Sequence, residues 1–119
     1  MRVTTVAYAF GPAVAVSAAI LFLSHQPVLP APTGNDKVAH VIAYTAVGAT
    51  YLHALLLGTS WPRTLVLGFV LASLFGVTDE VHQSFVPGRH ADVGDVLADV
   101  VGAALGTALA ALVYRRRLR

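Results

Sequence analysis

Four long runs of apolar residues divide the chain, and each is long enough to cross a lipid bilayer as a helix. A helix rises 1.5 Å per residue, so a hydrocarbon core about 30 Å thick requires roughly 20 apolar residues. Segments rich in proline and glycine separate the runs and mark the turns between them. The pattern predicts an all-α bundle of four transmembrane helices, forming one domain over residues 1–119, with helices at 3–23, 38–57, 64–85 and 93–114.

The composition favours a membrane protein over a soluble domain. Of the 119 residues, 56% are hydrophobic and only 12% are charged, whereas soluble domains carry roughly 25% charged residues. The chain has no cysteine, which excludes disulfides and thiolate metal sites. The first apolar run is longer than the roughly 7–15 residues of a signal-peptide core, and no small-residue cleavage motif follows it. We therefore expect this run to be a retained helix.

The basic residues predict the orientation of the bundle. Four spans place both termini on one side of the membrane, and basic residues concentrate on the cytoplasmic side. The side that carries the termini would hold six of the eight basic residues, so both termini are predicted to be cytoplasmic. The C-terminal RRRLR supplies much of the basicity, which favours contact with membrane lipids and not with nucleic acid. The opposite side holds only Lys37 and Arg89.

All six acidic residues gather at the opposite, extracytoplasmic end of the predicted bundle, five of them in the segment TDEVHQSFVPGRHADVGDVLAD. Asp92, Asp95 and Asp99 share one face of the fourth helix, because residues three and four positions apart lie on the same side. Gly102 and Gly106 continue this face, and glycines four residues apart let two helices pack closely. We therefore expect the acids to turn into the bundle, toward the second helix.

Polar side chains of the second and third helices are predicted to meet these acids. Lys37, His40 and Tyr44 fall on one face of the second helix, and Glu80 and Gln83 lie one turn apart on the third. Glu80 is placed roughly 26 Å along its helix from the cytoplasmic boundary, which is within the hydrocarbon thickness. Ionisable residues at such a depth are costly unless they are paired or hydrated, so they mark a candidate functional site.

The segments DKVAHVIAY at 36–44 and DEVHQSFVPGRHADVGDVLADVVGAALG at 79–106 resemble the VanZ-like family of small bacterial membrane proteins. They match the patterns D-K-x-x-H-x-x-x-Y and D-E-x-x-Q-x-F-x-P-x-R…D-x-x-x-N-x-x-G, except that Asp99 stands where the family usually has asparagine. The resemblance implies a polytopic fold in the bacterial cytoplasmic membrane and a role in the cell envelope. The family takes its name from a protein associated with teicoplanin resistance. The matching positions are Asp36, Lys37, His40, Tyr44, Glu80, Gln83, Pro87, Arg89, Asp95 and Gly102.

Three kinds of function are compatible with this polar end. In the first, it binds an envelope component, such as a lipid-linked precursor or a glycopeptide, with Lys37 and Arg89 holding anionic groups. In the second, it is a hydrolase or transferase in which Glu80 or Asp95 acts as the general base. In the third, Asp99 and Glu80 relay protons in a small transporter. The candidate catalytic residues are Glu80, Asp95 and His40, and the candidate ligand-binding residues are Lys37, Tyr44, Gln83, Arg89 and Asp99.

Two further interpretations stay open. A divalent metal ion is a variant of the enzyme hypothesis, although no HExxH or comparable spacing supports it. Alternatively, the polar residues are structural, with Lys37 and Arg89 neutralising the acids and locking three helix ends together. The first helix is mostly apolar and is expected to contribute packing. The possible metal ligands are His40, Glu80, His82, Asp95 and Asp99.

Overall fold

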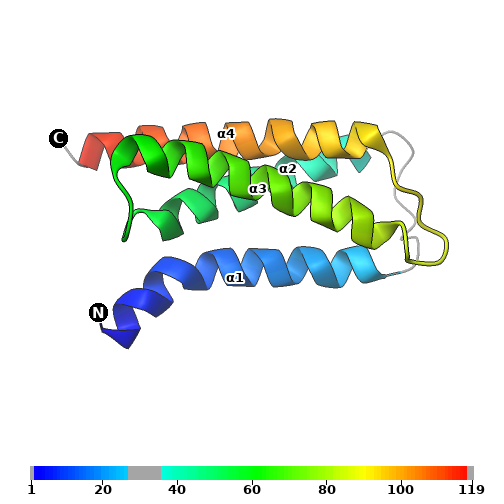
Figure 1. Cartoon of the computed structure of the whole chain (residues 1–119), viewed down its shortest axis with the longest axis horizontal. Coiled ribbons are helices and arrows are strands. Elements are labelled where there is room, and N and C mark those ends of the chain that lie inside the picture. The colour runs from blue at the N-terminus through cyan, green and yellow to red at the C-terminus, as the bar shows by residue number, and fades with distance from the viewer. Residues whose placement is uncertain (1, 27–35, 118–119) are drawn as a thin grey trace.

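The computed structural model of the chain describes residues 2–26 and 36–117, and over these ranges it contains four helices and no strand. The helices run side by side, with residues 2 and 117 at the same end of the bundle (Figure 1). Each helix is long and apolar enough to cross a membrane, which confirms the predicted four-helix architecture. The helices are α1 (Val3–His25), α2 (Asp36–Leu55), α3 (Trp61–Gln83) and α4 (Val93–Arg117).

Glycines allow α2 and α4 to pack with their backbones in close approach. A methyl group placed on Gly102 would lie 2.6 Å from the Val41 carbonyl oxygen, and one placed on Gly106 would collide with the Thr45 carbonyl. From the other side, Gly48 of α2 faces the backbone of α4. The face of α4 that carries these glycines is thus its packing face, because only glycine leaves room for the α2 backbone there.

A proline in α1 creates a backbone acceptor that α2 satisfies. Pro12 has no N–H, so the carbonyl of Tyr8, one turn earlier, loses its partner within the helix. The His53 Nε2 lies 3.2 Å from this carbonyl oxygen, and the His53 Nδ1 contacts the Tyr114 hydroxyl. A proline within a membrane helix is tolerated when neighbouring groups take up the freed carbonyl. His53 therefore joins α1, α2 and α4 near the end that carries the termini.

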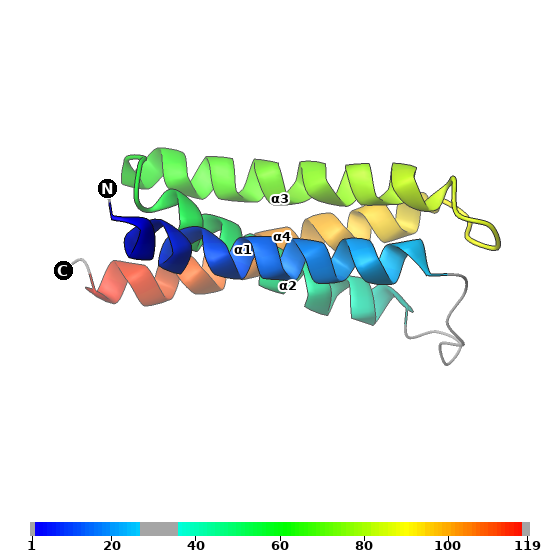
Figure 2. The ribbon, with the colours of Figure 1, turned by 90° about the horizontal axis from the view of Figure 1, so that it is seen from below.

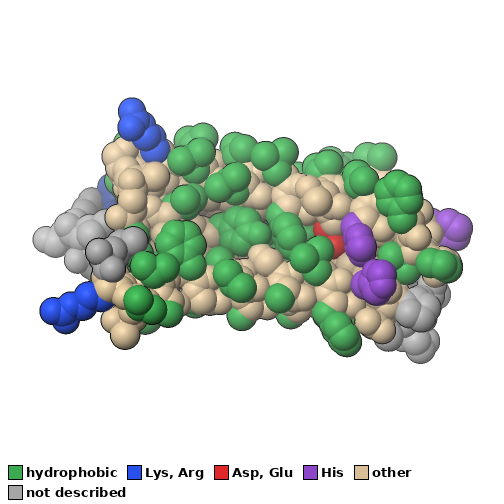
Figure 3. Space-filling view, turned by 60° about the horizontal axis from the view of Figure 1, so that its bottom comes forward, with side chains coloured by type: hydrophobic (Ala, Val, Ile, Leu, Met, Phe, Trp, Pro, Cys, Tyr) green, Lys and Arg blue, Asp and Glu red, His purple; other side chains and the backbone are tan. Residues whose placement is uncertain are grey.

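The outer surface of the bundle is apolar along its middle and polar at its two ends. Seen from below, the bundle is again an elongated body of side-by-side helices (Figure 2). Hydrophobic side chains cover the middle of the face in Figure 3, with Lys and Arg at the terminal end and His at the opposite end. Exposed apolar side chains come from every helix and include Val14, Ile42, Val66, Leu74 and Leu109. This surface suits lipid contact between two aqueous boundaries.

Candidate functional site

A tight turn brings the ends of α3 and α4 together at the polar end of the bundle. The Arg89 N–H donates to the Val86 carbonyl at 3.1 Å, with Pro87 and Gly88 at the two central positions. Gly88 has a φ of 82°, the left-handed conformation that the third residue of a type II turn requires. Directly before α4, Asp92 accepts a hydrogen bond from the N–H of Gly94 at 2.8 Å and so caps that helix.

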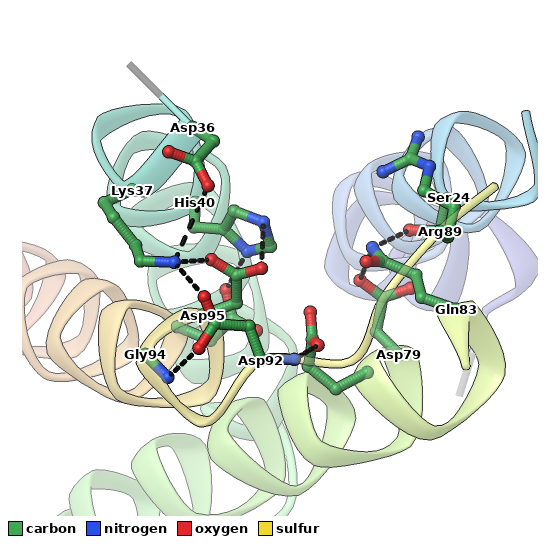
Figure 4. Close-up of polar contacts among 12 residues, drawn as sticks. Ser24, Asp36, Lys37, His40, Asp79, Gln83, Arg89, Asp92, Gly94 and Asp95 are labelled. Atoms are coloured by element: carbon green, nitrogen blue, oxygen red, sulfur yellow. Dashed lines mark hydrogen bonds and ion pairs between the residues drawn. The ribbon is translucent and has the colours of Figure 1, made fainter. Parts of the chain in front are cut away.

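The acids of α4 meet Lys37 and His40 of α2, as the shared helix faces predict. The Lys37 ammonium lies 2.7 Å from the Asp92 carboxylate and also contacts Asp95 (Figure 4). The His40 Nδ1 lies 2.7 Å from Asp99 Oδ1, and its Nε2 lies 3.8 Å from Asp95 Oδ2. Together with Glu80 of α3, these residues form what we call the carboxylate cluster.

Glu80 joins the carboxylate cluster from the third helix. Its side chain is only 3% exposed, and one carboxylate oxygen accepts the backbone N–H of Asp92 at 3.0 Å. The other oxygen, Oε1, is buried without a hydrogen-bond partner in the described part of the chain, as is Oδ2 of the fully buried Asp99. A buried acceptor without a donor costs free energy, so each of these oxygens marks a place for a cation or a hydrogen-bond donor.

Negative charge predominates in the carboxylate cluster. It contains four carboxyl groups, from Glu80, Asp92, Asp95 and Asp99, but only one ammonium and one imidazole. At its aqueous edge, the hydrogen bond from Lys37, followed by that from the Gly94 N–H, holds the pKa of the Asp92 carboxyl below its usual range. Asp92 therefore keeps its charge in mildly acidic medium. The cluster is suited to a cationic group more than to a free anion.

A second polar group links α1, α2 and α3. Asp79 is 1% exposed and accepts hydrogen bonds from the Tyr44 hydroxyl at 3.2 Å and from the Gln83 amide at 3.4 Å. The same amide nitrogen lies 3.2 Å from the Ser24 hydroxyl of α1. Figure 4 shows this group beside α1 and the carboxylate cluster beside α4. Adjacent acids on α3, Asp79 and Glu80, thus serve different groups, because successive helical residues point about 100° apart.

A pocket of about 180 Å³ lies between α1, α2 and α3 and touches both polar groups. Its polar lining comes from both groups and from the turn, and its apolar lining comes from α1 and α2. It therefore offers both polar and apolar side chains at one end of the bundle. The lining residues are Ile20, Leu23, Ser24, Ala39, His40, Ala43, Tyr44, Asp79, Gln83 and Arg89.

Arg89 does not make the contacts that the structural interpretation requires of it. Its guanidinium donates to the backbone carbonyls of Gln26, at 3.1 Å, and Leu23, at 3.0 Å. These carbonyls lie at the end of α1, where the last carbonyls lack the usual partner one turn later within the helix, and the Leu23 carbonyl also accepts the N–H of Gln26. Among the described residues, Arg89 makes no ion pair with the carboxylate cluster, and it lines the pocket instead. Arg89 thus attaches the turn to α1, while Lys37 alone supplies the neutralising ammonium.

His82 also lies away from the carboxylate cluster, although it was one of the five possible metal ligands. Its Nε2 is 3.3 Å from the Nδ1 of His25, at the end of α1. In addition to the expected packing, α1 contributes polar contacts, because Ser17 and Ser24 both bond to other helices. These two serines are seven residues apart, a spacing that places them on one face of α1. That spacing was the sequence signal for the contribution of α1.

These features define a polytopic membrane protein with a polar site at one end of its helix bundle. The sequence model of the VanZ/LLP1 family matches residues 6–114, and the chain belongs to this family. The chain is also similar to the uncharacterized protein C11E3.10 of Schizosaccharomyces pombe, with 32% identity over 98 residues. That match covers 82% of the chain and 59% of the S. pombe protein, so the chain spans less than two thirds of that relative's length. No solved structure matches the chain.

Proposed function

We propose that this chain binds a lipid-linked cell-envelope component through the polar end of its bundle, at the extracytoplasmic face of a bacterial cytoplasmic membrane. The observation that carries the proposal is the pocket between α1, α2 and α3, with its mixed polar and apolar lining. A lipid-linked molecule has the same two-sided character, since a polar head group adjoins hydrocarbon. Binding of such a component would contribute to tolerance of glycopeptides such as teicoplanin.

The size of the pocket favours a head-group fragment over a whole antibiotic. Its volume of about 180 Å³ corresponds to roughly six water molecules at about 30 Å³ each. A phosphate or part of a sugar occupies such a volume, whereas a glycopeptide would be confined to the mouth of the pocket. Gln83 and Arg89 in the pocket lining can donate hydrogen bonds, and Asp79 can accept them. A glycopeptide effect would then arise through the precursor that the antibiotic also recognises.

Replacing Gln83 with leucine should weaken binding of the component and leave the bundle folded. The substitution removes the amide donors from the pocket wall but keeps most of the side-chain volume, and we expect a loss of affinity of about ten-fold or more. Binding of a fluorescent lipid-linked peptidoglycan precursor to the purified chain in nanodiscs measures this loss. Thr78→Val is the matched control on the same helix, because the Thr78 side chain is exposed and bonds only to its own helix at Leu74.

Two further variants distinguish the proposed binding function from a purely structural role. Glu80→Gln and Arg89→Ala should abolish any teicoplanin tolerance while protein levels stay near normal. Loss of folded protein in both variants would instead favour a purely structural role for these residues. Equal precursor affinity in Gln83→Leu and the unaltered chain would contradict the proposed pocket.

A membrane hydrolase or transferase is the second candidate function. The unpartnered Oε1 of Glu80 favours it, since a buried carboxylate beside His40 and Asp95 is placed to accept a proton from a nucleophile. In this case the carboxylate cluster would perform chemistry on the head group that the pocket binds. Release of product from the same lipid-linked precursor in the nanodisc experiment separates this enzyme from a binding protein, because a binding protein returns the precursor intact.

The polar end should face the outside of the cell. Since the chain has no cysteine, His90→Cys and Ser60→Cys each introduce a single thiol at an exposed position at opposite ends of the bundle. A membrane-impermeant maleimide should label position 90 in intact cells and position 60 only after the membrane is permeabilised. The expectation follows from the six basic residues predicted on the terminal side. The reverse labelling pattern would overturn the orientation.

A further inference from the structure

Three side chains from three helices converge within the carboxylate cluster. His40, Glu80 and Asp95 each offer one ligand atom, and these three atoms all lie within 4.8 Å of one another. The closest recorded approach joins His40 Nε2 and Asp95 Oδ2 at 3.8 Å. A tetrahedral zinc ion, with bonds of roughly 2.0–2.2 Å, separates its ligands by about 3.4 Å. Small side-chain movements would therefore bring this set to the distances that an ion requires.

One polar atom of each of these three side chains already has a partner that fixes its direction. Asp99 bonds to the Nδ1 of His40, which leaves Nε2 for a ligand. The Asp92 N–H bonds to the Oε2 of Glu80, and Lys37 contacts the Oδ1 of Asp95. The free atoms are then one imidazole nitrogen and two carboxylate oxygens. Metal-binding histidines almost always carry such a carboxylate or carbonyl partner on their second nitrogen.

A buried oxygen without a donor gives independent support for a ligand at this place. Glu80 is only 3% exposed, and its Oε1 has no hydrogen-bond partner among the described residues. If the cluster only neutralised charge, this buried oxygen would remain without a hydrogen-bond donor, which is unfavourable. A cation bound between the three helices removes that cost and reduces the net negative charge of the cluster.

We propose that His40, Glu80 and Asp95 bind one divalent transition-metal ion of the Zn²⁺ or Mn²⁺ type, with Asp99 as a positioning residue. One imidazole and two carboxylates suit these ions, since imidazole favours Zn²⁺ and carboxylate favours Mn²⁺. Three protein ligands leave at least one position for water or for an anionic group. The proposal goes beyond binding of an envelope component, because metal binding can be measured with no such component present.

Metal titration of the purified chain tests this site. The full chain in nanodiscs, dialysed against a chelator, is titrated separately with Zn²⁺ and Mn²⁺, and bound metal is counted after desalting. We expect one ion per chain. Glu80→Gln and His40→Gln should abolish stoichiometric binding, and Asp99→Asn should lower the affinity about 10–100-fold by releasing the His40 ring.

Matched controls come from the same end of the bundle. His82→Gln replaces a histidine that faces His25, and Asp36→Asn replaces an exposed carboxylate outside the converging set, so both should bind metal as the unaltered chain does. If Glu80→Gln or His40→Gln fails to fold, pulsed electron paramagnetic resonance of Mn²⁺ on the unaltered chain supplies the test. Coupling of Mn²⁺ to one imidazole nitrogen that persists in His82→Gln supports the site.

Two outcomes would overturn the metal proposal. One is the absence of stoichiometric binding of either ion to the folded chain, and the other is an Mn²⁺ signal without imidazole coupling. Binding of the lipid-linked precursor in excess chelator, with no metal bound, would leave the proposed pocket intact while removing the ion. Conversely, one ion per chain with no precursor affinity would retain the ion and remove the proposed ligand. The two proposals therefore fail separately.

Discussion

Gly106→Val should destabilise the bundle by about 3 kcal/mol or more. A Cβ at this position would collide with the Thr45 carbonyl and would lie 2.9 Å from the Ala49 nitrogen. These are backbone atoms of α2, so no side-chain rotation can relieve the overlap, and α2 and α4 must move apart. Overpacking in a close-packed interior typically costs 1–3 kcal/mol, and a backbone obstacle places this substitution at or above the upper limit. Reversible unfolding in detergent, followed by circular dichroism, measures the loss.

Gly11→Val is the matched control for this prediction. Gly11 also lies within a helix, one residue before Pro12, but a Cβ there would meet no atom of another helix within 4 Å. Both substitutions replace glycine with the same residue, so the change in intrinsic helix propensity is shared and slightly favourable. We expect Gly11→Val to leave the free energy of unfolding within about 0.5 kcal/mol of the unaltered chain. Equal destabilisation at both positions would show that helix contact through Gly106 does not hold the bundle together.

The helices and the face of α4 could be predicted because both depend on local periodicity. The length of an apolar run alone indicates a transmembrane span. The structure has the four predicted helices, and only their first and last residues differ from the prediction, since α3 begins at Trp61. Residues three and four positions apart must share a side of a helix, so the stripe from Asp92 to Gly106 was readable in the sequence. The stripe also indicated its partner, because close glycines require a neighbouring helix.

The division of the site into two polar groups could not be predicted in the same way. Asp79 and Glu80 are neighbours in sequence, and which helix each one faces depends on the positions of α1 and α4 around α3. Arg89 lies in a turn, where no helical period fixes its direction, and it bonds to carbonyls of α1 that carry no side-chain signal. The sequence therefore indicates the residue types of the site but not the contact between Arg89 and the end of α1.

The convergence of His40, Glu80 and Asp95 was likewise hidden from spacing rules. Each residue comes from a different helix, so no motif within one segment could place them within 4.8 Å of one another. The sequence did restrict the set, since it put all three at one end of the bundle. What it could not supply was the rotation of the three helices about their axes. That rotation directs His82 toward His25 and Glu80 toward Asp92.

His40→Leu should destabilise the metal-free bundle by about 3–5 kcal/mol, the usual cost of removing one partner from a buried charged pair. Asp99 is fully buried, its Oδ1 is bonded to His40, and its Oδ2 already lacks a partner. Without the imidazole, the whole carboxylate would be unsatisfied between α2, α3 and α4. The measurement is unfolding in detergent with a chelator present, so that any bound ion makes no contribution.

Asp99→Asn in the same chain provides the rescue. An amide has nearly the shape of a carboxylate but carries no charge to desolvate, so we expect His40→Leu with Asp99→Asn to recover most of the lost stability. Asp99→Asn alone should cost about 1 kcal/mol, since His40 is only half-buried and keeps Asp95 nearby. If the double variant is as unstable as His40→Leu, the imidazole stabilises the bundle by packing and not through Asp99. If the double variant recovers its stability, the metal-free bundle requires His40 because of the charge of Asp99. The Asp99→Asn variant then measures the contribution of that carboxylate to metal affinity.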